Sequence, residues 1–168
     1  YASSAAVYGD NPDLPLAETA RPQPLSAYGA DKFGCELHAR VGGVVHGVPT
    51  AGMRFFNVYG PRQDPKSPYS GVISIFAEKV RTRQPCTILG DGGQARDFVY
   101  VADVVAALRA ALGAATVDGQ VFNVGTGIAT KVVDLAKLLQ GLAGSPAGPV
   151  FAPARAGDIR LSLCDPAK

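Results

Sequence analysis

The sequence predicts an α/β protein with parallel strand pairs. Short apolar runs typical of strands alternate with segments of helical periodicity, and clusters of glycine, proline and polar residues separate them. Hydrophobic residues make up 47% of the 168 positions and charged residues 18%, which is typical of a globular chain with its own core. Strands that alternate with helices pair in parallel, because each helix returns the chain to the same end of the sheet.

The N-terminal third predicts a strand end, a loop and a long helix. Residues 1–8 have the pattern of a buried strand that runs into a loop, and four prolines in residues 11–24 extend this loop. We expect Ser26 to begin a helix that reaches about Val48. One side of this helix is apolar and carries Phe33, Leu37, Val41 and Val44 or Val45.

The rest of the chain alternates regularly. Strands are expected at residues 50–57, 86–89, 98–101 and 121–124, and helices at residues 72–83, 102–114 and 131–142. Asp103 lies in the favourable first turn of its helix, and Thr130 is a candidate N-cap of the last helix. Loops or turns are expected at residues 60–71, 91–93 and 125–127, and the tail from Pro149 is irregular with one edge strand.

The composition argues against several classes of function. A net charge of +2 without a Lys/Arg cluster predicts no nucleic-acid partner, and no apolar run reaches membrane-spanning length. His38 and His46 lie too far apart along one predicted helix to share an ion, so we expect no metal site. Three widely spaced cysteines predict free thiols in a reducing cytoplasm, and they are Cys35, Cys86 and Cys164.

A tyrosine and a lysine stand one helical turn apart in the first long helix. Tyr28 and Lys32 therefore share a side of the helix, where the ammonium group favours the ionised form of the phenol. A free tyrosine, with a pKa near ~10, is a poor base at neutral pH without such help. Together with Ser3 and Ser4 upstream, the pair indicates redox chemistry at a hydroxyl-bearing carbon. Alone, a helical tyrosine is more often packing, and serines are more often turn residues.

Further motifs follow this pair in a fixed order. They are residues 3–9, 54–62, 90–92, 96–103, 122–127 and 155–158. In order, spacing and identity they resemble the extended short-chain dehydrogenase/reductase family, and within it the nucleotide-sugar 4-epimerases of the UDP-glucose/UDP-N-acetylglucosamine type. Ala5 and Ala6 stand where the dehydratase branch usually carries an acidic residue for the elimination of water. Their identity favours an epimerase.

The resemblance implies NAD-dependent inversion at C4 of a UDP-hexose or UDP-N-acetylhexosamine. A hydride would pass from C4 to NAD+, the 4-keto intermediate would turn over, and the hydride would return to the opposite face. Tyr28 would take the hydroxyl proton as the catalytic base, and Ser4 would hydrogen-bond the reacting oxygen. Lys32 would assist the phenolate and bind the nicotinamide ribose.

The resemblance also implies a set of substrate-binding residues. Asn57, Arg96 and Arg155 would hold the diphosphate, for which the planar guanidinium is well suited. Asp158 would bind the ribose hydroxyls, and Ser162 would leave room for an N-acetyl group at C2 of the sugar. The nucleotide would be bordered by Val72 and by the backbone of Thr87, Ile88 and Leu89.

Several neighbours of these residues have a plainer interpretation. An exposed position is the default for any arginine, and we expect Arg54 and Arg62 to be exposed or structural. Asp97 is expected to order its own loop. The Gly-Thr-Gly sequence at residues 125–127 is interpreted as a tight turn, since two glycines alone are weak evidence for a phosphate loop.

The implied architecture is a partial Rossmann-like α/β fold with a small α/β substrate-binding subdomain. Residues 1–60 would be the C-terminal part of the NAD-binding domain, and residues 61–168 mainly the nucleotide-sugar-binding subdomain, with 98–125 on the Rossmann side. No glycine-rich dinucleotide fingerprint follows an early strand, so we interpret the chain as a fragment that is inactive alone. The resemblance suggests a homodimer that uses the Tyr28 helix. The alternatives are another nucleotide-sugar dehydratase or reductase of this family, or a non-catalytic binding module on the same scaffold.

Overall fold

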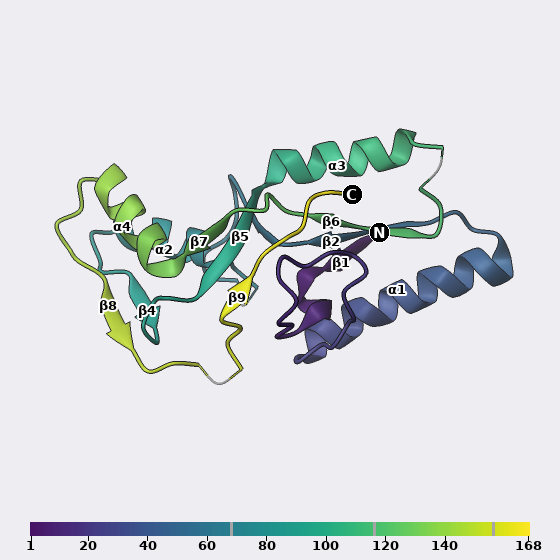
Figure 1. Cartoon of the computed structure of the whole chain (residues 1–168). Helices are drawn as coiled ribbons and strands as arrows, with labels where there is room; N and C mark the ends of the chain where they lie inside the picture. The colour runs from purple at the N-terminus through teal and green to yellow at the C-terminus, as the bar shows by residue number, and fades with distance from the viewer. Residues whose placement is uncertain (68, 116, 156) are drawn as a thin grey trace.

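The structure is a computed structural model, and it describes residues 1–67, 69–115, 117–155 and 157–168. Within these residues the strands form three small sheets, and four α-helices pack around them (Figure 1). The strands are β1 (Ala2–Ser4), β2 (Ala51–Phe55), β3 (Asn57–Tyr59), β4 (Thr87–Leu89), β5 (Ala95–Tyr100), β6 (Gln120–Val124), β7 (Ala129–Lys131), β8 (Val150–Ala152) and β9 (Leu161–Ser162). The helices are α1 (Ala27–His46), α2 (Val72–Arg81), α3 (Val101–Gly113) and α4 (Val132–Leu142).

The first sheet is parallel throughout, with the strand order β1-β2-β6. Helix α1 covers one face and α3 the other, which is the arrangement that parallel strands require when both of their faces are buried (Figure 1). In the register of this sheet Ser3 stands beside Arg54, and Ser4 beside Phe55. The two serines of the sequence motif therefore lie at the carboxyl end of β1.

The second sheet continues directly from the first. Buried Phe56 separates β2 from β3, and its N–H bonds the carbonyl of Val124, so the single strand expected at residues 50–57 divides into two. Strand β3 pairs in parallel with β5, which also pairs antiparallel with β7 and in parallel with β9. Along β5 the residues alternate between the two faces, so that Arg96 and Phe98 share one face while Asp97 faces the core.

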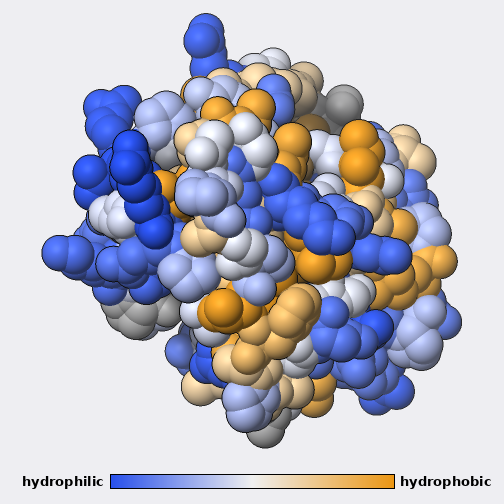
Figure 2. Space-filling model, turned by 90° about the vertical axis from the view of Figure 1, so that its left-hand side faces the viewer, coloured by the Kyte–Doolittle hydropathy of each residue, from blue (hydrophilic) through white to orange (hydrophobic). Residues whose placement is uncertain are grey.

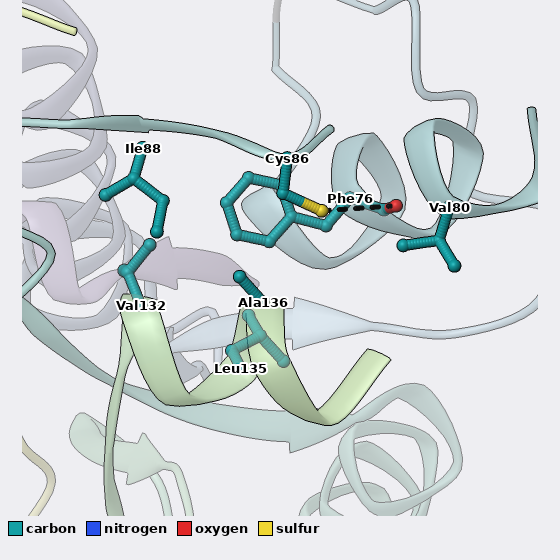
Figure 3. Packing of buried hydrophobic residues seen from close by; sticks show 7 residues of the cluster. All are labelled: Phe76, Val80, Cys86, Ile88, Val132, Leu135 and Ala136. Carbon is teal, nitrogen blue, oxygen red and sulfur yellow. Dashed lines mark hydrogen bonds between the residues drawn. The ribbon is translucent and has the colours of Figure 1, made fainter. Parts of the chain in front are cut away.

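The third sheet consists of β4 and β8 and lies at the opposite side of the molecule from α1 (Figure 1). Helices α2 and α4 pack against it through an apolar cluster that includes Phe76 of α2, Ile88 of β4 and Val132 of α4 (Figure 3). Figure 2 views this side of the molecule and shows apolar atoms in separate groups among polar ones. The exposed large apolar side chains of α4 and β8 are Leu138, Leu142, Val150 and Phe151.

Helix α1 begins and ends as its sequence predicts, but its apolar side is not buried. The hydroxyl of Ser26 accepts a hydrogen bond from the Gly29 N–H, and Gly47 ends the helix in the left-handed conformation that glycine adopts readily. Leu37, Val41, Val44 and Val45 share a side as expected, and all four are exposed. Only Phe33 of this set packs partly against a core cluster.

The main differences from the sequence prediction concern short strands and one cap. Strand β7 was not predicted, and the C-terminal tail contains two strands, β8 and β9, instead of one. Thr130 belongs to β7 and does not cap α4, whose N-cap is Lys131 without a side-chain hydrogen bond. The antiparallel pairing with β5 holds Thr130 in extended backbone opposite Arg96, which explains the missed cap. None of the helices in the described part of the chain combines the length and apolar character of a membrane span.

Candidate functional site

A cavity of about 570 Å³ opens where the carboxyl ends of β1 and β2 meet β3 and the first residues of α2. This is the position at which parallel α/β sheets commonly bind ligands. Among the residues that line it are Ser4, Tyr28, Asn57, Tyr69 and Phe98. Three residues that the sequence predicts for catalysis or substrate binding, namely Ser4, Tyr28 and Asn57, thus border one hollow.

Tyr28 and Lys32 lie side by side at the rim of this cavity. Tyr28 stands in the first turn of α1, and 46% of its surface is exposed. The Lys32 ammonium lies 5.8 Å from the centroid of the Tyr28 ring and donates a hydrogen bond of 3.3 Å to the carbonyl of Ala2. The one-turn spacing therefore places the cation beside the phenol, while a backbone contact with β1 steadies the lysine.

The two serines of the motif have different surroundings. The hydroxyl of Ser3 is buried and donates to the Glu36 carboxylate over 2.5 Å. The hydroxyl of Ser4 accepts a 3.2 Å hydrogen bond from the Ala6 N–H and keeps its own proton for donation. Ser4 is thus the serine whose hydroxyl can serve a ligand in the cavity.

Tyr69 is a lining residue to which the sequence assigned no role. Its ring lies 6.4 Å from the Tyr28 ring, centroid to centroid, and is tilted by 41°. It belongs to the long loop between β3 and α2, and it lines the cavity together with Tyr28. An exposed aromatic in a loop carries no periodic signal, and only the fold reveals its proximity to Tyr28.

A second hollow, of about 310 Å³, lies between β4 and the C-terminal segment. Leu89, Arg155 and Asp158 line it. The Arg96 guanidinium donates to the Asp158 carboxylate over 2.6 Å at this hollow. Burial lowers the pKa of Arg96, and the ion pair with Asp158 opposes that shift, so the guanidinium stays charged at neutral pH.

Strand β5 joins the two hollows. Phe98 lines the first, and Arg96, two residues earlier on the same face of the strand, holds Asp158 of the second. Asn57 lies opposite Phe98 in the β3–β5 register and donates through its amide to the Asp97 carbonyl over 3.0 Å. The same face of β5 therefore carries one residue that lines the first hollow and one that holds a residue of the second.

Five of the predicted substrate-binding residues line neither hollow, and one of them is Arg96, which reaches the second hollow only through its ion pair with Asp158. Ile88 is fully buried in the cluster between α2 and α4, so its side chain faces away from ligands, and Thr87 is exposed on the same strand. Val72 packs partly against that cluster at the start of α2. Ser162 lies in β9 opposite Arg96 and is half-buried.

A buried ion pair lies next to Ser3, which lines the first cavity, and no local sequence pattern predicts it. Arg54 donates to both oxygens of Glu36, over 2.8 and 2.7 Å, and to the Tyr8 hydroxyl over 2.8 Å. Burial opposes the charge of Arg54, but the bonds to Glu36 and Tyr8 outweigh it and keep the pKa of the guanidinium above its usual range. Of the two interpretations of Arg54, the structural one is correct.

The turn at residues 125–127 is held by a carboxylate. Asp97 is fully buried and accepts hydrogen bonds from the backbone N–H groups of Thr126, Gly127 and Cys164. These N–H groups are the donors that a phosphate would need, so the turn is a tight connection, as expected. Asp97 orders this turn and the C-terminal segment, whereas the expectation was that it orders its own loop.

The remaining titratable residues offer no further centre in the described part of the chain. Its His, Cys, Asp and Glu side chains form no group of three that could bind a metal ion. The three cysteines, Cys35, Cys86 and Cys164, are all free thiols.

Comparison with known proteins places this geometry in context. The profile of the NAD dependent epimerase/dehydratase family matches residues 1–125. The chain is 39% identical to the UDP-glucose 4-epimerase of Mycolicibacterium smegmatis over 163 residues, which are 97% of this chain and 51% of that protein. The chain spans about half the length of the curated relatives it matches.

Solved structures agree with this similarity. The UDP-N-acetylglucosamine 4-epimerase of Methanobrevibacter ruminantium, in complex with UDP-N-acetylmuramic acid, superposes with a TM-score of 0.95 at 35% identity. The UDP-glucose 4-epimerase of Thermotoga maritima with UDP-glucose has a TM-score of 0.93 at 40% identity. Each superposition covers 99% of this chain and 53% of the solved chain. The expected Rossmann-like α/β class is confirmed.

Proposed function

This chain belongs to the NAD dependent epimerase/dehydratase family, and from that membership we propose that it is part of an enzyme that inverts C4 of a UDP-hexose or UDP-N-acetylhexosamine. The observation that carries the proposal is the meeting of Ser4 and Tyr28 at one cavity, with the Lys32 ammonium beside the phenol. This chain matches only about half the length of its relatives, so the activity is proposed for a complete protein that contains this chain.

The residues at the cavity rim fit the nicotinamide end of NAD, the cofactor of the family. Lys32 has three N–H donors, and one of them bonds Ala2, so two remain for ribose hydroxyls beside Tyr28. Bound NAD+ supplies the acceptor for the C4 hydride and later its donor. The glycine-rich turn that binds a dinucleotide diphosphate is not in this sequence, so this chain would hold the cofactor at one end only.

Proton transfer is the task of Tyr28 and Ser4. The Tyr28 phenolate takes the proton from the C4 hydroxyl of the sugar, and the Lys32 ammonium lies beside the ring. Ser4 donates its hydroxyl proton to the reacting oxygen, because its lone-pair side already accepts from Ala6. The partly exposed phenol can exchange its proton once the sugar is released.

The substrate diphosphate would be held along β5. Asn57 and Arg96 approach it from β3 and β5, and Arg155 approaches it from the second hollow. Asp158 would bind the ribose hydroxyls, and Leu89 would border the nucleotide with Val72 and the Thr87–Ile88 backbone. The Arg96–Asp158 ion pair supports this arrangement, because a proposed phosphate ligand and a proposed ribose ligand then lie side by side, as do the two groups of one nucleotide.

The cavity favours epimerisation over the dehydration that other members of the family perform. Elimination of water needs an additional acid or base near the sugar. Among the described residues that line the cavity, none is Asp, Glu, His or Cys. Ala5 and Ala6, in the 3-10 turn that follows Ser4, carry no ionisable group either.

The complete protein is proposed to be a cytoplasmic homodimer in which residues 1–60, with 98–125, complete a NAD-binding domain and most of 61–168 binds the nucleotide sugar. The exposed apolar side of α1, with Leu37, Val41, Val44 and Val45, supplies a surface for the partner subunit. The three free thiols agree with a reducing compartment.

The test compares this chain with the complete protein that contains it. Each is incubated with NAD+ and with UDP-glucose or UDP-N-acetylglucosamine, and the sugar products are identified by NMR. We expect C4 epimers from the complete protein, and neither turnover nor firm NAD+ binding from this chain alone.

Other outcomes would separate the alternatives. A 4-keto product that has lost water indicates a dehydratase, and binding without turnover by the complete protein indicates a binding module. Firm NAD+ binding by this chain alone would contradict the proposal that the chain is inactive because it lacks the glycine-rich part of the cofactor-binding domain.

A further inference from the structure

Helix α1, which carries Tyr28 and Lys32, is attached to the protein in an unusual way. Its two buried residues are Gly29 and Glu36, whereas its apolar side faces solvent. Seven residues are close to two helical turns, so Gly29 and Glu36 lie on one line along the helix. The buried contacts of α1 are therefore a glycine against the turn after β1 and a carboxylate against the sheet, where an apolar stripe would be usual.

Gly29 determines how closely α1 approaches the turn after Ser4. A Cβ atom at this position would lie 2.6 Å from the carbonyl oxygen of Ala6 and 3.1 Å from the Cβ of Pro24. The Ala6 oxygen belongs to the backbone and cannot rotate away, so any side chain at position 29 must displace the helix or the turn. The same Ala6 donates its N–H to the Ser4 hydroxyl.

Glu36 determines the rotation of α1 about its axis. Its two oxygens accept from Arg54 over 2.8 and 2.7 Å, and one of them also accepts from Ser3 over 2.5 Å. Arg54 and Ser3 are neighbours in the β1–β2 register, so the carboxylate contacts two adjacent strands at once. A planar, two-bond ion pair tolerates little rotation, and its partner Arg54 is fixed further by the Tyr8 hydroxyl.

We propose that Gly29 and Glu36 are positioning residues for the reaction, with Gly29 setting the distance and Glu36 the rotation that bring Tyr28 toward Ser4. The roles of Tyr28 and Ser4 in this inference rest on the proposed function. Neither Gly29 nor Glu36 lines the cavity, so both act through the placement of the helix. Tyr28 directly precedes Gly29, so the Gly29 contact lies one residue from the proposed base. Ser4 directly follows Ser3, so the Glu36–Ser3 contact lies one residue from the second proposed catalytic group.

The first experiment measures the geometry in this chain and needs no activity. Gly34 lies in the same helix and has nothing within 4 Å of its Cβ position, so Gly34→Ala is the matched control for Gly29→Ala. Tyrosine-ring NMR reports the contact between the Tyr28 and Tyr69 rings, which are 6.4 Å apart. We expect Gly29→Ala to weaken the Tyr28–Tyr69 cross-peak and to shift the Ser4 amide signal, and Gly34→Ala to leave both unchanged.

Glu36→Gln is the second variant, because it keeps the shape and part of the hydrogen bonding while it removes the charge. It should also shift the Tyr28 and Ser4 signals, and it replaces Gly29→Ala where that variant fails to fold. Glu78→Gln breaks an exposed pair with Arg81 on α2 and serves as its control. Folded Gly29→Ala and Glu36→Gln proteins with unchanged Tyr28 and Ser4 signals would overturn the inference.

The second experiment measures turnover in the complete protein. A misplacement of about 1 Å can reduce turnover about a hundredfold, so we expect kcat to fall by roughly ten- to a hundredfold in Gly29→Ala and Glu36→Gln. KM for the nucleotide sugar should stay within about twofold, because the proposed diphosphate ligands Arg96 and Arg155 take no part in the contacts of Gly29 and Glu36.

The two experiments separate the inference from the proposed function. Inactivity of the unmodified complete protein would refute the proposed function, while the NMR result would still decide whether Gly29 and Glu36 place Tyr28. If the activity of a variant falls only in proportion to the amount of folded protein, kcat per folded molecule equals that of the unmodified protein. That result would show a purely structural role and refute the inference.

Discussion

The carboxylate of Asp97 accepts two hydrogen bonds from Thr126, one from the backbone N–H and one from the side-chain hydroxyl, each 2.8 Å long. It also accepts from the N–H groups of Gly127 and Cys164, so one buried side chain in β5 connects the turn after β6 with the C-terminal segment. The segment that carries Arg155, Asp158 and Ser162 is thereby tied to the strand that carries Arg96.

Replacement of Asp97 should destabilise the protein strongly. Asp97→Ala leaves one buried donor, the Cys164 N–H, without its acceptor, at about 1–3 kcal/mol, and it removes the part-buried bonds to Thr126 and Gly127, so we expect a loss of at least about 2 kcal/mol in the free energy of unfolding. Asp97→Asn should lose less, because its amide oxygen still accepts. Urea unfolding measures both, and Asp103→Asn at the surface of α3 should change stability by less than about 1 kcal/mol. Equal effects at positions 97 and 103 would refute this account.

Sequence reasoning succeeded where a pattern is local. The helices at Ala27–His46 and Val72–Arg81 have clear starts and stops, and the strand at Gln120–Val124 is a compact apolar run. Strand β7 was missed, and β8 and β9 were predicted as one edge strand, because a strand of two or three residues is too short to show a periodic pattern. The pairing of these strands with β5 or β4 decides their structure.

Contacts between residues that are far apart in the chain are the second feature that the sequence does not predict. Glu36 and Arg54 are individually unremarkable charges, and only the docking of α1 on β1 and β2 makes them a buried pair. The apolar side of α1 shows the same limit in another way. Its periodicity correctly predicts that the apolar residues lie on one side of the helix, but not whether that side is buried, and it is exposed. For the candidate site, motif order identified Ser4, Tyr28 and Asn57, but the contact of Tyr69 with Tyr28 required the fold.

Loss of the Tyr28 hydroxyl should remove most of the activity of the complete protein. Tyr28→Phe keeps the ring contact with Tyr69 but cannot accept the substrate proton, and general-base catalysis contributes about 10²–10⁴-fold. We therefore expect kcat to fall by at least about a hundredfold with little change in KM.

Ser4→Ala should also lower kcat, but less than Tyr28→Phe does, since it removes a hydrogen bond but not the base. Steady-state kinetics would check both, with Ser74→Ala, outside this cavity, as the control. Full activity of Tyr28→Phe is the result that excludes the proposed mechanism.

A larger residue at position 162 should change substrate preference. Ser162 lies opposite Arg96 on β9, beside the proposed course of the nucleotide sugar. Ser162→Tyr should crowd an N-acetyl group at C2 and reduce kcat/KM for the UDP-N-acetylhexosamine by about tenfold or more relative to the UDP-hexose. Competition assays with both substrates measure this ratio. An equal loss on both substrates would contradict a role of Ser162 in discrimination.

The buried thiol of Cys164 should make the protein sensitive to alkaline pH. Burial and the nearby Asp97 charge raise the pKa of Cys164 from 9.0 to about 12 in the folded protein. Because the unfolded chain releases this proton near pH 9 and the folded protein retains it, rising pH favours unfolding. The stabilisation is complete below pH 9 and declines toward pH 12, by up to about 1.4 kcal/mol per pH unit.

Chemical unfolding between pH 8 and 10 tests this slope in three proteins. Cys164→Ala costs stability at neutral pH through the cavity that it creates, but its stability should fall less steeply above pH 9 than that of the unmodified chain. Cys35 is exposed, so Cys35→Ala should keep the original slope. Burial also raises the pKa values of Cys86 and Tyr8, so some slope remains in every variant. Parallel curves for the unmodified chain and Cys164→Ala would show that another group releases the proton on unfolding.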